Sequence, residues 1–481
     1  MEPLDTFPYR HRVAELMVRP IVTIDGTSLV ADAVRLMNGR HISSVIVVDA
    51  EGRLQGILTE RDVLKVLARD PTGLTRAVSA AMTCPVHSVE ADTPVYRALA
   101  RMTRLGIRHL PVVDDNERPI GMLTSRALLK LRASLALTIG DEIACAGNGA
   151  TLRAIHDRLP ELARALRAEA LGAAQVSNVI AGIVRDLSAR AADLALAGMT
   201  SGGRGPPPSD WCFLVLGSAG RGESLLAADQ DNALIHTGRD DNDAWFASFA
   251  ELINRLLDEA GVPYCKGGVM ASNPPYRHSL TNWHAQIDRW IARRDPEAIL
   301  GVDIFYDFTP VAGARRLAIA LREHATLAAR RSPSFLQLLA AATQDVPSAT
   351  DLLGRLRTRG GRIDLKKYGL FPIVAGARVA ALAWGSAATG TDARLVEVAA
   401  KGAFAKEAAQ ALSEARAILV EAILDQQLHD SAAGRPADNE VDPARYDRPS
   451  LSRLRDALAI ATQVPELVHD ALSNRPLVPT P

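Results

Sequence analysis

An internal repeat constrains the fold of this chain more than any other feature of its sequence. Residues 17–68 match residues 82–133 at a constant offset of 65, and no gap is needed. The pairs that set this register include Met17/Met82, Pro20/Pro85, Ala33/Ala98, Met37/Met102, Val47/Val112, Gly56/Gly121, Leu58/Leu123 and Thr59/Thr124. A duplication that keeps one register implies one small structural unit used twice.

Each copy has the same order of predicted elements. In the first copy, Val30, Ala33 and Met37 recur at the spacing of one helix face. An apolar, β-branched run at 45–48, a turn and a second apolar run at 54–58 predict two adjacent strands. A further helix follows the second run, so the repeat predicts a β-α-β-β-α unit that occurs twice.

This order of elements resembles a tandem pair of CBS domains over residues 10–135. In that family the segment G-h-x-[ST]-x-x-[DN] binds adenosine nucleotides: the hydroxyl and a helix N-terminus hold phosphate, and the carboxylate binds ribose. Thr59 and Asp62 match this segment in the first copy, whereas the second copy has Thr124 but Ala127 in place of the carboxylate. The resemblance implies one complete site for AMP, ADP or ATP and a second, weak or empty one. The alternative is that Thr59 and Asp62 only cap a helix.

A helical segment and a boundary follow the repeat. Residues 150–200 have a helical pattern almost throughout, and Pro160 interrupts it, so we expect two helices rather than one. Such a segment would connect two domains or form a dimer interface. Glycines and three consecutive prolines at 201–210 mark a domain boundary.

A glycine-rich turn and an acidic pair come next. The turn follows an apolar strand predicted over 211–216, and ten residues separate Ser218 from Asp229. Backbone N–H groups of such a turn, with the Ser218 hydroxyl, are suited to bind a triphosphate. Asp229 and Asp231 face the same side of a strand and can both bind Mg²⁺. An Asp-x-Asp pair alone is more often a solvated loop, so the prediction depends on the combination.

The string GSAGRGESLLAADQDNALI at 217–235 resembles the nucleotidyltransferase superfamily of DNA polymerase β and the PII-protein uridylyltransferases. It is most similar to the branch of CBS-linked signal-transduction nucleotidyltransferases. The resemblance implies that an NMP is transferred from an NTP to an acceptor hydroxyl with Mg²⁺ or Mn²⁺. It also implies that the triphosphate is held by Gly217 and Ser218, that the loop or phosphate is oriented by Arg221, and that the metal is bound by Asp229 and Asp231.

The same family has a third carboxylate on a later strand. Its pattern F-F-D-[FL]-R-P-V-x-G matches FYDFTPVAG at 305–313, which places that carboxylate at Asp307. We expect a strand over 303–311 in which Asp307 binds metal or acts as the base, whereas Asp303 is an exposed strand-end carboxylate. Thr309 replaces the arginine of the family, a departure that would reduce or alter activity.

Two further segments resemble this branch. CKGGVMASNP at 265–274 is close to the family string CxGGVMASNP, and it is suited either to contact a nucleotide or acceptor or to pack as a loop. Residues 333–475 have a mostly helical pattern and resemble the substrate-binding helical domain of the family. Lys366 and Arg378, in and after its IDLK-x-x-G-L-x-P-I motif, would stabilise triphosphate charge, with surface ion pairing as the alternative.

Composition restricts the classes of function and the location. Lys plus Arg and Asp plus Glu both total 55, so a formal charge of zero gives no overall attraction to nucleic acid or an anionic membrane. The absence of a run of 18 or more uncharged apolar residues argues against a membrane-spanning helix. The N-terminus has no apolar signal segment, and the four cysteines are scattered. We therefore expect a cytoplasmic protein with reduced thiols.

The sequence therefore predicts an α/β multidomain protein. Its parts are a tandem CBS pair at 10–135, a helical connector at 150–200, a polymerase β-like nucleotidyltransferase α/β domain at 205–330 and a helical substrate-binding domain at 333–475. The resemblance implies Mg²⁺-dependent NMP transfer to a protein or small-molecule acceptor, regulated by adenine nucleotide on the CBS pair, in a homodimer. A regulatory protein is one such acceptor. The alternative is a non-catalytic nucleotide sensor, which Thr309 favours; neutral charge disfavours a polynucleotide polymerase.

Overall fold

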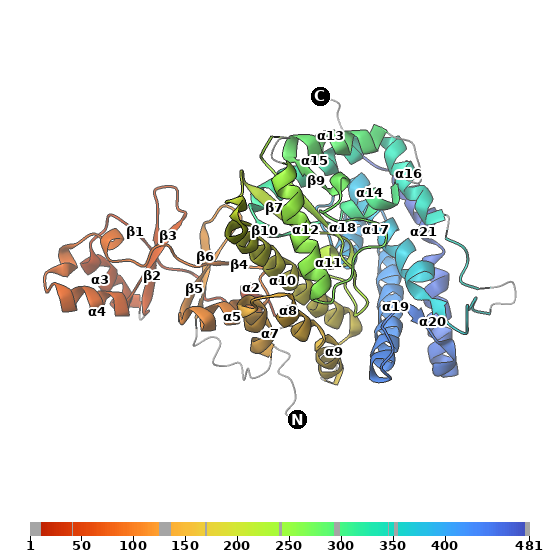
Figure 1. Ribbon diagram of the computed structural model, residues 1–481, viewed down its shortest axis with the longest axis horizontal. Helices are drawn as coiled ribbons and strands as arrows, with labels where there is room; N and C mark the ends of the chain where they lie inside the picture. Colours follow the sequence, from red (N-terminus) through yellow and green to blue (C-terminus); the bar gives the residue numbers. More distant parts are fainter. Residues whose placement is uncertain are drawn as a thin grey trace. The chain divides into compact units, whose positions relative to one another are not determined.

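The structure is a computed structural model that describes residues 11–40, 42–124, 136–168, 171–239, 243–292, 299–344, 346–350 and 355–476. The chain forms two compact units, Met1–Glu142 and Ile143–Pro481 (Figure 1). Each unit has its own hydrophobic clusters, so the two are described separately.

The N-terminal unit contains the repeat as two three-stranded sheets. The first copy consists of β1 (Thr23–Asp25), α3 (Val30–Arg40), β2 (Ser44–Val48), β3 (Leu54–Thr59) and α4 (Glu60–Arg69). The second copy consists of β4 (Val89–Glu90), α5 (Val95–Leu105), β5 (His109–Val113) and β6 (Pro119–Thr124). The last predicted helix of the second copy falls mostly outside the described residues. In each sheet the first two strands are parallel and the last two antiparallel.

The register of the two sheets reproduces the offset in the sequence. Ser44 pairs with Thr59 in the first copy, and His109 pairs with Thr124 in the second. A register irregularity at the end of β2 recurs at the corresponding place in β5. The predicted β-α-β-β-α order and the internal repeat are therefore confirmed over the described residues.

Two glycines explain why the copies interlock. A Cβ on Gly56 would collide with the Met82 sulfur, and a Cβ on Gly121 would collide with the Met17 sulfur. The backbone that precedes each copy also forms an antiparallel bridge to the last strand of the other copy. Each copy therefore completes the packing of the other.

The C-terminal unit begins with helices and then forms a mixed sheet. The helices are α8 (Gly149–His156), α9 (Leu159–Ala168) and α10 (Ala173–Met199), after α7 (Ala136–Cys145) at the division between the units. The sheet strands are β7 (Trp211–Val215), β8 (Asn232–His236), β9 (Arg277–Ser279) and β10 (Thr309–Gly313), in the order β10-β7-β8-β9. Only the β8–β9 pair of this sheet is parallel.

Helices cover both faces of this sheet, which explains why β7 is apolar throughout. On one face Phe213 packs among residues of α10 and of α12 (Asp243–Glu259). On the other face Cys212 and Leu214 pack in the large core with α13 (Leu280–Ala292) and α15 (Arg315–Arg331). Trp283 and Trp290 of α13 are buried there and belong to the core, as their helical spacing predicts.

The predicted strand over 303–311 is wrong in its first half. Residues up to Phe305 form α14 (Ile299–Phe305), and β10 begins only at Thr309. The apolar residues Val302, Phe305 and Tyr306 follow the spacing of a helix face, and all three are buried. Asp303 is also buried, with 5% of its surface exposed, and is not the exposed strand-end carboxylate we expected.

The remaining chain is mostly helical and packs around one central helix. Its helices are α16 (Pro333–Gln344), α17 (Phe371–Trp384), α18 (Thr391–Ala400), α19 (Lys406–Ala432), α20 (Arg448–Ala461) and α21 (Val464–Ser473). A short antiparallel pair, β11 (Ile363–Asp364) and β12 (Glu440–Val441), joins distant segments. Every residue from 372 to 383 in α17 is buried, as expected of a helix surrounded by others. None of the described helices is long and apolar enough to cross a lipid bilayer.

Candidate active site

A cleft of about 740 Å³ lies within the C-terminal unit, between the sheet region and the helical region. Its walls bring together predicted site residues that are far apart in the sequence, namely Gly217, Ser218, Arg221, Asp229, Asp231, Lys366 and Arg378. One part of the wall is apolar and comes from α16, α17 and α19. A cleft of this size can enclose a small-molecule substrate.

The glycine-rich turn follows β7 directly and forms the single helical turn α11 (Gly217–Arg221). Gly217 has a φ of +58°, and a Cβ at this position would collide with a carboxylate oxygen of Asp231. The residue before it, Leu216, donates its backbone N–H to the Asp231 carbonyl oxygen at 2.8 Å. Glycine is therefore needed here both for its backbone conformation and because the Asp231 carboxylate takes the place that a Cβ would need.

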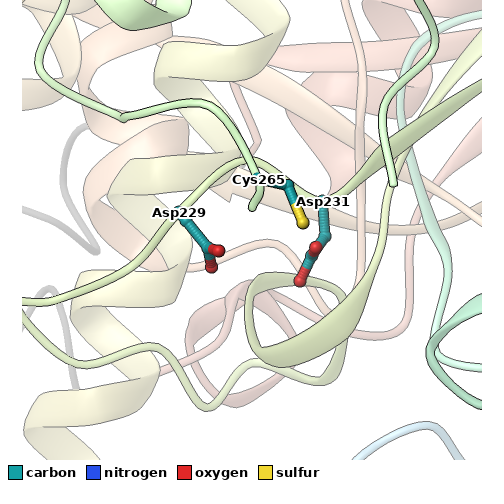
Figure 2. A group of neighbouring side chains, drawn as sticks. All are labelled: Asp229, Asp231 and Cys265. Carbon is teal, nitrogen blue, oxygen red and sulfur yellow. The ribbon is translucent and has the colours of Figure 1, made fainter. Parts of the chain in front are cut away.

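Asp229, Asp231 and Cys265 converge on one point of the cleft region (Figure 2). One carboxylate oxygen of each aspartate and the Cys265 sulfur lie within 4.8 Å of one another. The two aspartates lie just before β8, whereas Cys265 comes from the loop after α12. Among the residues that the structure describes, no other group of three such ligand atoms lies so close together.

The electrostatics of this group favour a bound cation. Burial, and then the charge of Asp229, raise the pKa of Asp231 to about 6. Burial, and then the charge of Asp231, raise the pKa of the Cys265 thiol to about 11. Both shifts show that negative charge is costly here without a counter-ion, and a divalent cation would supply one. Two carboxylates whose oxygens lie close together are a donor set that fits such an ion.

A buried amide network holds the acidic pair in place. Gln230, between the two aspartates, donates to the backbone carbonyl oxygens of Asn254 and Val262 at 2.9 Å each. The Asn254 side chain donates to Gln230 Oε1 at 2.8 Å and to Asn232 Oδ1 at 3.0 Å. Gln230 therefore faces the protein interior, while its neighbours line the cleft. The sequence pattern gave no signal for Asn254, because its role depends on the tertiary contact between α12 and β8.

Asp307, the expected third carboxylate, lies in a different environment. It is fully buried and accepts hydrogen bonds from Arg221 (2.5 Å), Arg378 (2.6 and 3.0 Å) and Arg394 (2.7 Å). Burial raises the pKa of Asp307, but the arginines outweigh it and hold this pKa far below its usual range. Its metal or base role stays a prediction, and the geometry argues against it because both oxygens are engaged by guanidinium groups.

Arg378 and Lys366 differ in their availability. The Arg378 guanidinium is buried and binds both Asp303 and Asp307, so two carboxylates already compensate its charge. Lys366 lines the cleft, and its charge opposes the rise in the pKa of Asp231 that burial and Asp229 cause. Of the two residues predicted to contact phosphate, Arg378 is therefore engaged by buried carboxylates, whereas the charge of Lys366 acts on the acidic pair.

The glycine-rich loop is bonded to the helical region through Glu223. The Glu223 carboxylate accepts from the Thr391 backbone N–H at 2.6 Å, from the Thr391 hydroxyl at 3.0 Å and from Arg221 Nε at 2.8 Å. It thereby caps the N-terminus of α18, where the preceding Gly390 has no side chain to do so. Thr309, at the position of the family arginine, donates its hydroxyl to the Gly220 carbonyl oxygen at 2.9 Å. Sequence reasoning missed Glu223, because its partner Thr391 lies 168 residues further along the chain.

In the N-terminal unit, Thr59 and Asp62 form the helix cap that we considered as the alternative. The Thr59 hydroxyl lies 2.7 Å from Asp62 Oδ2, the Asp62 N–H donates to the Thr59 hydroxyl at 3.3 Å, and Lys65 binds Asp62 at 3.0 Å. Both residues lie at the start of α4. Thr124 ends β6 in the corresponding position, and Ala127 lies outside the described residues. A ligand role for Thr59, Asp62 and Thr124 stays a prediction.

The fold and the site together define a CBS domain pair joined to a nucleotidyltransferase-like domain and a helical substrate-binding domain. Residues 13–69 and 78–134 each match the CBS domain family. Residues 157–297 match the family described as "Putative nucleotidyltransferase DUF294", and residues 333–472 match the "Putative nucleotidyltransferase substrate binding domain". The chain therefore belongs to the DUF294 nucleotidyltransferase family that carries a CBS domain pair.

Individual relatives match only about a quarter of the chain. An uncharacterized protein, MK0525, of Methanopyrus kandleri is 34% identical over 132 residues, which are 27% of this chain and 67% of that protein. Inosine-5'-monophosphate dehydrogenase of Methanocaldococcus jannaschii is 34% identical over 118 residues, but the chain spans only 23% of that enzyme. A solved CBS domain pair of protein MJ0100, in complex with 5'-methylthioadenosine and S-adenosyl-L-methionine, is 28% identical. It covers 25% of this chain and 94% of its own, with a TM-score of 0.24.

Proposed function

We propose that this protein transfers a nucleoside monophosphate from an NTP to an acceptor hydroxyl in a reaction that requires Mg²⁺ or Mn²⁺. The observation that supports this proposal is the convergence of Asp229 and Asp231 beside the Gly217 turn, in a cleft of about 740 Å³. In the reaction the acceptor oxygen bonds to the α-phosphorus, the bond from that phosphorus to the pyrophosphate leaving group breaks, and the proton of the hydroxyl passes to solvent. A cation held by the two aspartates would neutralise charge on the phosphate oxygens.

The other residues of the cleft have separate roles in this proposal. Backbone N–H groups at Gly217 and the Ser218 hydroxyl bind the triphosphate, and Lys366 adds a positive charge to the lining of the same cleft. Arg221 orients the loop, since it bonds to both Glu223 and Asp307. Asp307 then acts as the buried anchor of this arrangement rather than as a group that touches substrate.

We further propose that adenine nucleotides bind the CBS pair at Thr59 and Asp62 and regulate the transfer. The CBS family match and the predicted domain limits of 10–135, 150–200, 205–330 and 333–475 support a sensor joined to a catalytic unit through α8–α10. We infer a cytoplasmic homodimer that acts on a small molecule or a regulatory protein.

One observation favours a second candidate function. Because the Asp307 carboxylate is bound by three arginines, the acidic pair lacks the third carboxylate of the family pattern. A protein of this kind would bind NTP without turnover and serve as a nucleotide sensor.

Pyrophosphate release tests the transfer directly. Full-length protein is incubated with each labelled NTP, with Mg²⁺ or Mn²⁺ and with fractions of a cell lysate that supply acceptors. We expect metal-dependent release of pyrophosphate that the Asp229→Asn/Asp231→Asn variant loses and that Asp210→Asn, a change at an exposed ion pair, keeps. Tight NTP binding with no product in any fraction would instead support the sensor.

Calorimetry with AMP, ADP and ATP tests the CBS site on the full chain. Asp62→Ala should abolish binding, whereas Asp32→Ala should keep it. Asp32 is a suitable control because its carboxylate also accepts a backbone N–H at the start of a helix in the same unit. Equal binding by both variants would reject the ligand role of Asp62.

A further inference from the structure

We propose that the Cys265 sulfur is the third protein ligand of the cation held by Asp229 and Asp231. We also propose that this sulfur makes the site prefer transition-metal dications, such as Zn²⁺ and Mn²⁺, over Mg²⁺. The inference uses the proposed function in one respect only, since it takes the two aspartates as metal ligands.

The spacing of the three side chains suits one ion. Metal–oxygen bonds of about 2.0–2.2 Å and metal–sulfur bonds of about 2.3 Å place two ligands of one ion at most roughly 4.5 Å apart. The two carboxylate oxygens and the sulfur lie within 4.8 Å of one another, so all three could bind one ion after a small shift of the side chains toward it. Figure 2 shows the Cys265 side chain between the two aspartates, with its sulfur directed toward the same space as their carboxylates.

The backbone is folded around the sulfur. The Gly268 N–H donates to the Cys265 carbonyl oxygen at 3.0 Å and closes a tight turn. Gly268 has a φ of +71°, and a Cβ on Gly267 would lie 3.7 Å from the sulfur. The backbone N–H groups of Gly267 and Val269 contact the thiol. Such N–H groups stabilise and orient a ligating thiolate.

A second, independent observation comes from the opposite side of the site. At Gly217 the Asp231 carboxylate packs directly against the backbone, because a Cβ there would collide with one of its oxygens, and this close approach fixes where the carboxylate lies. Asp307, the ligand that the family pattern predicts, is engaged by three arginines. Within the described residues, Cys265 is thus the third donor that the site offers.

The chemistry of sulfur then determines the choice of metal. Mg²⁺ prefers an octahedral set of oxygen ligands, whereas thiolates bind softer ions such as Zn²⁺. Binding replaces the thiol proton by the metal: the S–H bond breaks, the sulfur–metal bond forms, and one proton passes to solvent.

Metal titrations of the full-length protein test this proposal without an activity assay. Cd²⁺ serves as a spectroscopic probe because its bond to thiolate gives a charge-transfer absorption in the ultraviolet, and calorimetry gives affinities for Zn²⁺, Mn²⁺ and Mg²⁺. We expect the absorption in wild type and in Cys145→Ser, a matched change at an exposed cysteine. It should be absent in Cys265→Ser, whose affinity for Zn²⁺ should fall roughly tenfold or more while that for Mg²⁺ stays the same.

Two further variants keep the test decisive. Asp231→Asn should weaken Cd²⁺ binding as measured by titration of the absorption. An unchanged Cd²⁺ affinity would show that the sulfur and this carboxylate do not share one ion and would overturn the proposal. Cys265→Asp should raise the affinity for Mg²⁺ relative to Zn²⁺.

The outcomes for the sulfur ligand and for NMP transfer can be told apart. Equal Zn²⁺ affinity in wild type and Cys265→Ser overturns the sulfur ligand but leaves NMP transfer intact. Conversely, a Cys265-dependent absorption with no turnover of any NTP supports the ligand and overturns the transfer.

Discussion

The substitution Asp307→Asn provides a quantitative test of the buried charge cluster beneath the cleft. Ion pairs link four positive and four negative side chains in this cluster, so its formal charges cancel. Its members are Arg221, Arg378, Arg394, Arg416, Asp303, Asp307, Glu223 and Asp392. Asp307 lies at its centre, with none of its side chain exposed, and accepts four N–H groups from the three arginines. Asparagine has nearly the same shape as aspartate, but it carries no charge, so one positive charge of the cluster is left without a partner. It also has only one oxygen to accept the four N–H groups that Asp307 accepts with two.

We expect Asp307→Asn to lower the free energy of unfolding of the C-terminal unit by about 3–5 kcal/mol, the usual cost of removing one partner from a buried ion pair. That is a large part of the roughly 5–15 kcal/mol that stabilises a typical domain. Asp210→Asn is the control, because Asp210 and Arg316 pair at the surface with 57% and 63% of their side chains exposed. Its cost should stay below about 1 kcal/mol.

Urea unfolding followed by tryptophan fluorescence measures this difference. The probe reports on the C-terminal unit alone, because all five tryptophans lie there, namely Trp211, Trp245, Trp283, Trp290 and Trp384. The double variant Asp307→Asn/Arg394→Met should recover part of the loss, since it restores the balance of charge. An Asp307→Asn midpoint equal to that of Asp210→Asn would refute the reasoning.

Three other changes test the loop, the cap and the C-terminal helices. Gly217→Ala and Gly360→Ala both place alanine at a φ of +58°, which costs each variant roughly 1–2 kcal/mol of backbone strain. Only at Gly217 would the added Cβ also collide with the Asp231 carboxylate, so only Gly217→Ala should lose further stability and weaken Mn²⁺ binding in calorimetry. Equal metal affinities of the two variants would contradict this. Glu223→Gln should weaken the hydrogen bonds at the N-terminus of α18 by about 1–3 kcal/mol. Hydrogen exchange of the first amides of α18 should therefore become faster, and kcat/KM for NTP should fall by about tenfold or more. Unchanged exchange would count against the cap. Hydrogen bonds from Arg362 and then Arg435 hold the pKa of buried Asp430 below its usual range. The stability lost in Asp430→Asn should therefore be complete above pH ~4 and shrink as the pH falls below it, and equal urea midpoint shifts at pH 7 and pH 3 would exclude this linkage.

Features of the fold that depend on neighbouring residues could be predicted from the sequence. The constant offset of 65 predicts that the two sheets of the N-terminal unit have the same strand register. The structure shows this, because the pair Ser44–Thr59 in one sheet corresponds to the pair His109–Thr124 in the other. The spacing between Ser218 and Asp229 is informative for a similar reason. β7 and β8 pair antiparallel, so the end of the first strand meets the start of the second, and the glycine turn comes to lie beside the acidic pair.

Features that depend on distant contacts could not be predicted. Asp307 meets Arg221 and Arg394, which lie 86 and 87 residues away in opposite directions, and no local pattern reports such a pair. The placement of Asp303 and Asp307 among apolar residues predicts a strand, whereas the structure has the helix α14 up to Phe305, with Val302, Phe305 and Tyr306 buried at helical spacing.

The reciprocal fit of two methionines into two glycine positions makes the N-terminal repeat indivisible. Met82 fills the notch at Gly56 in the first copy, and Met17 fills the notch at Gly121 in the second. If the two copies were separated, the first would lose the Met82 side chain that covers Gly56, and the second would lose the Met17 side chain that covers Gly121. We therefore expect a single copy, expressed alone, to expose apolar surface that the pair buries.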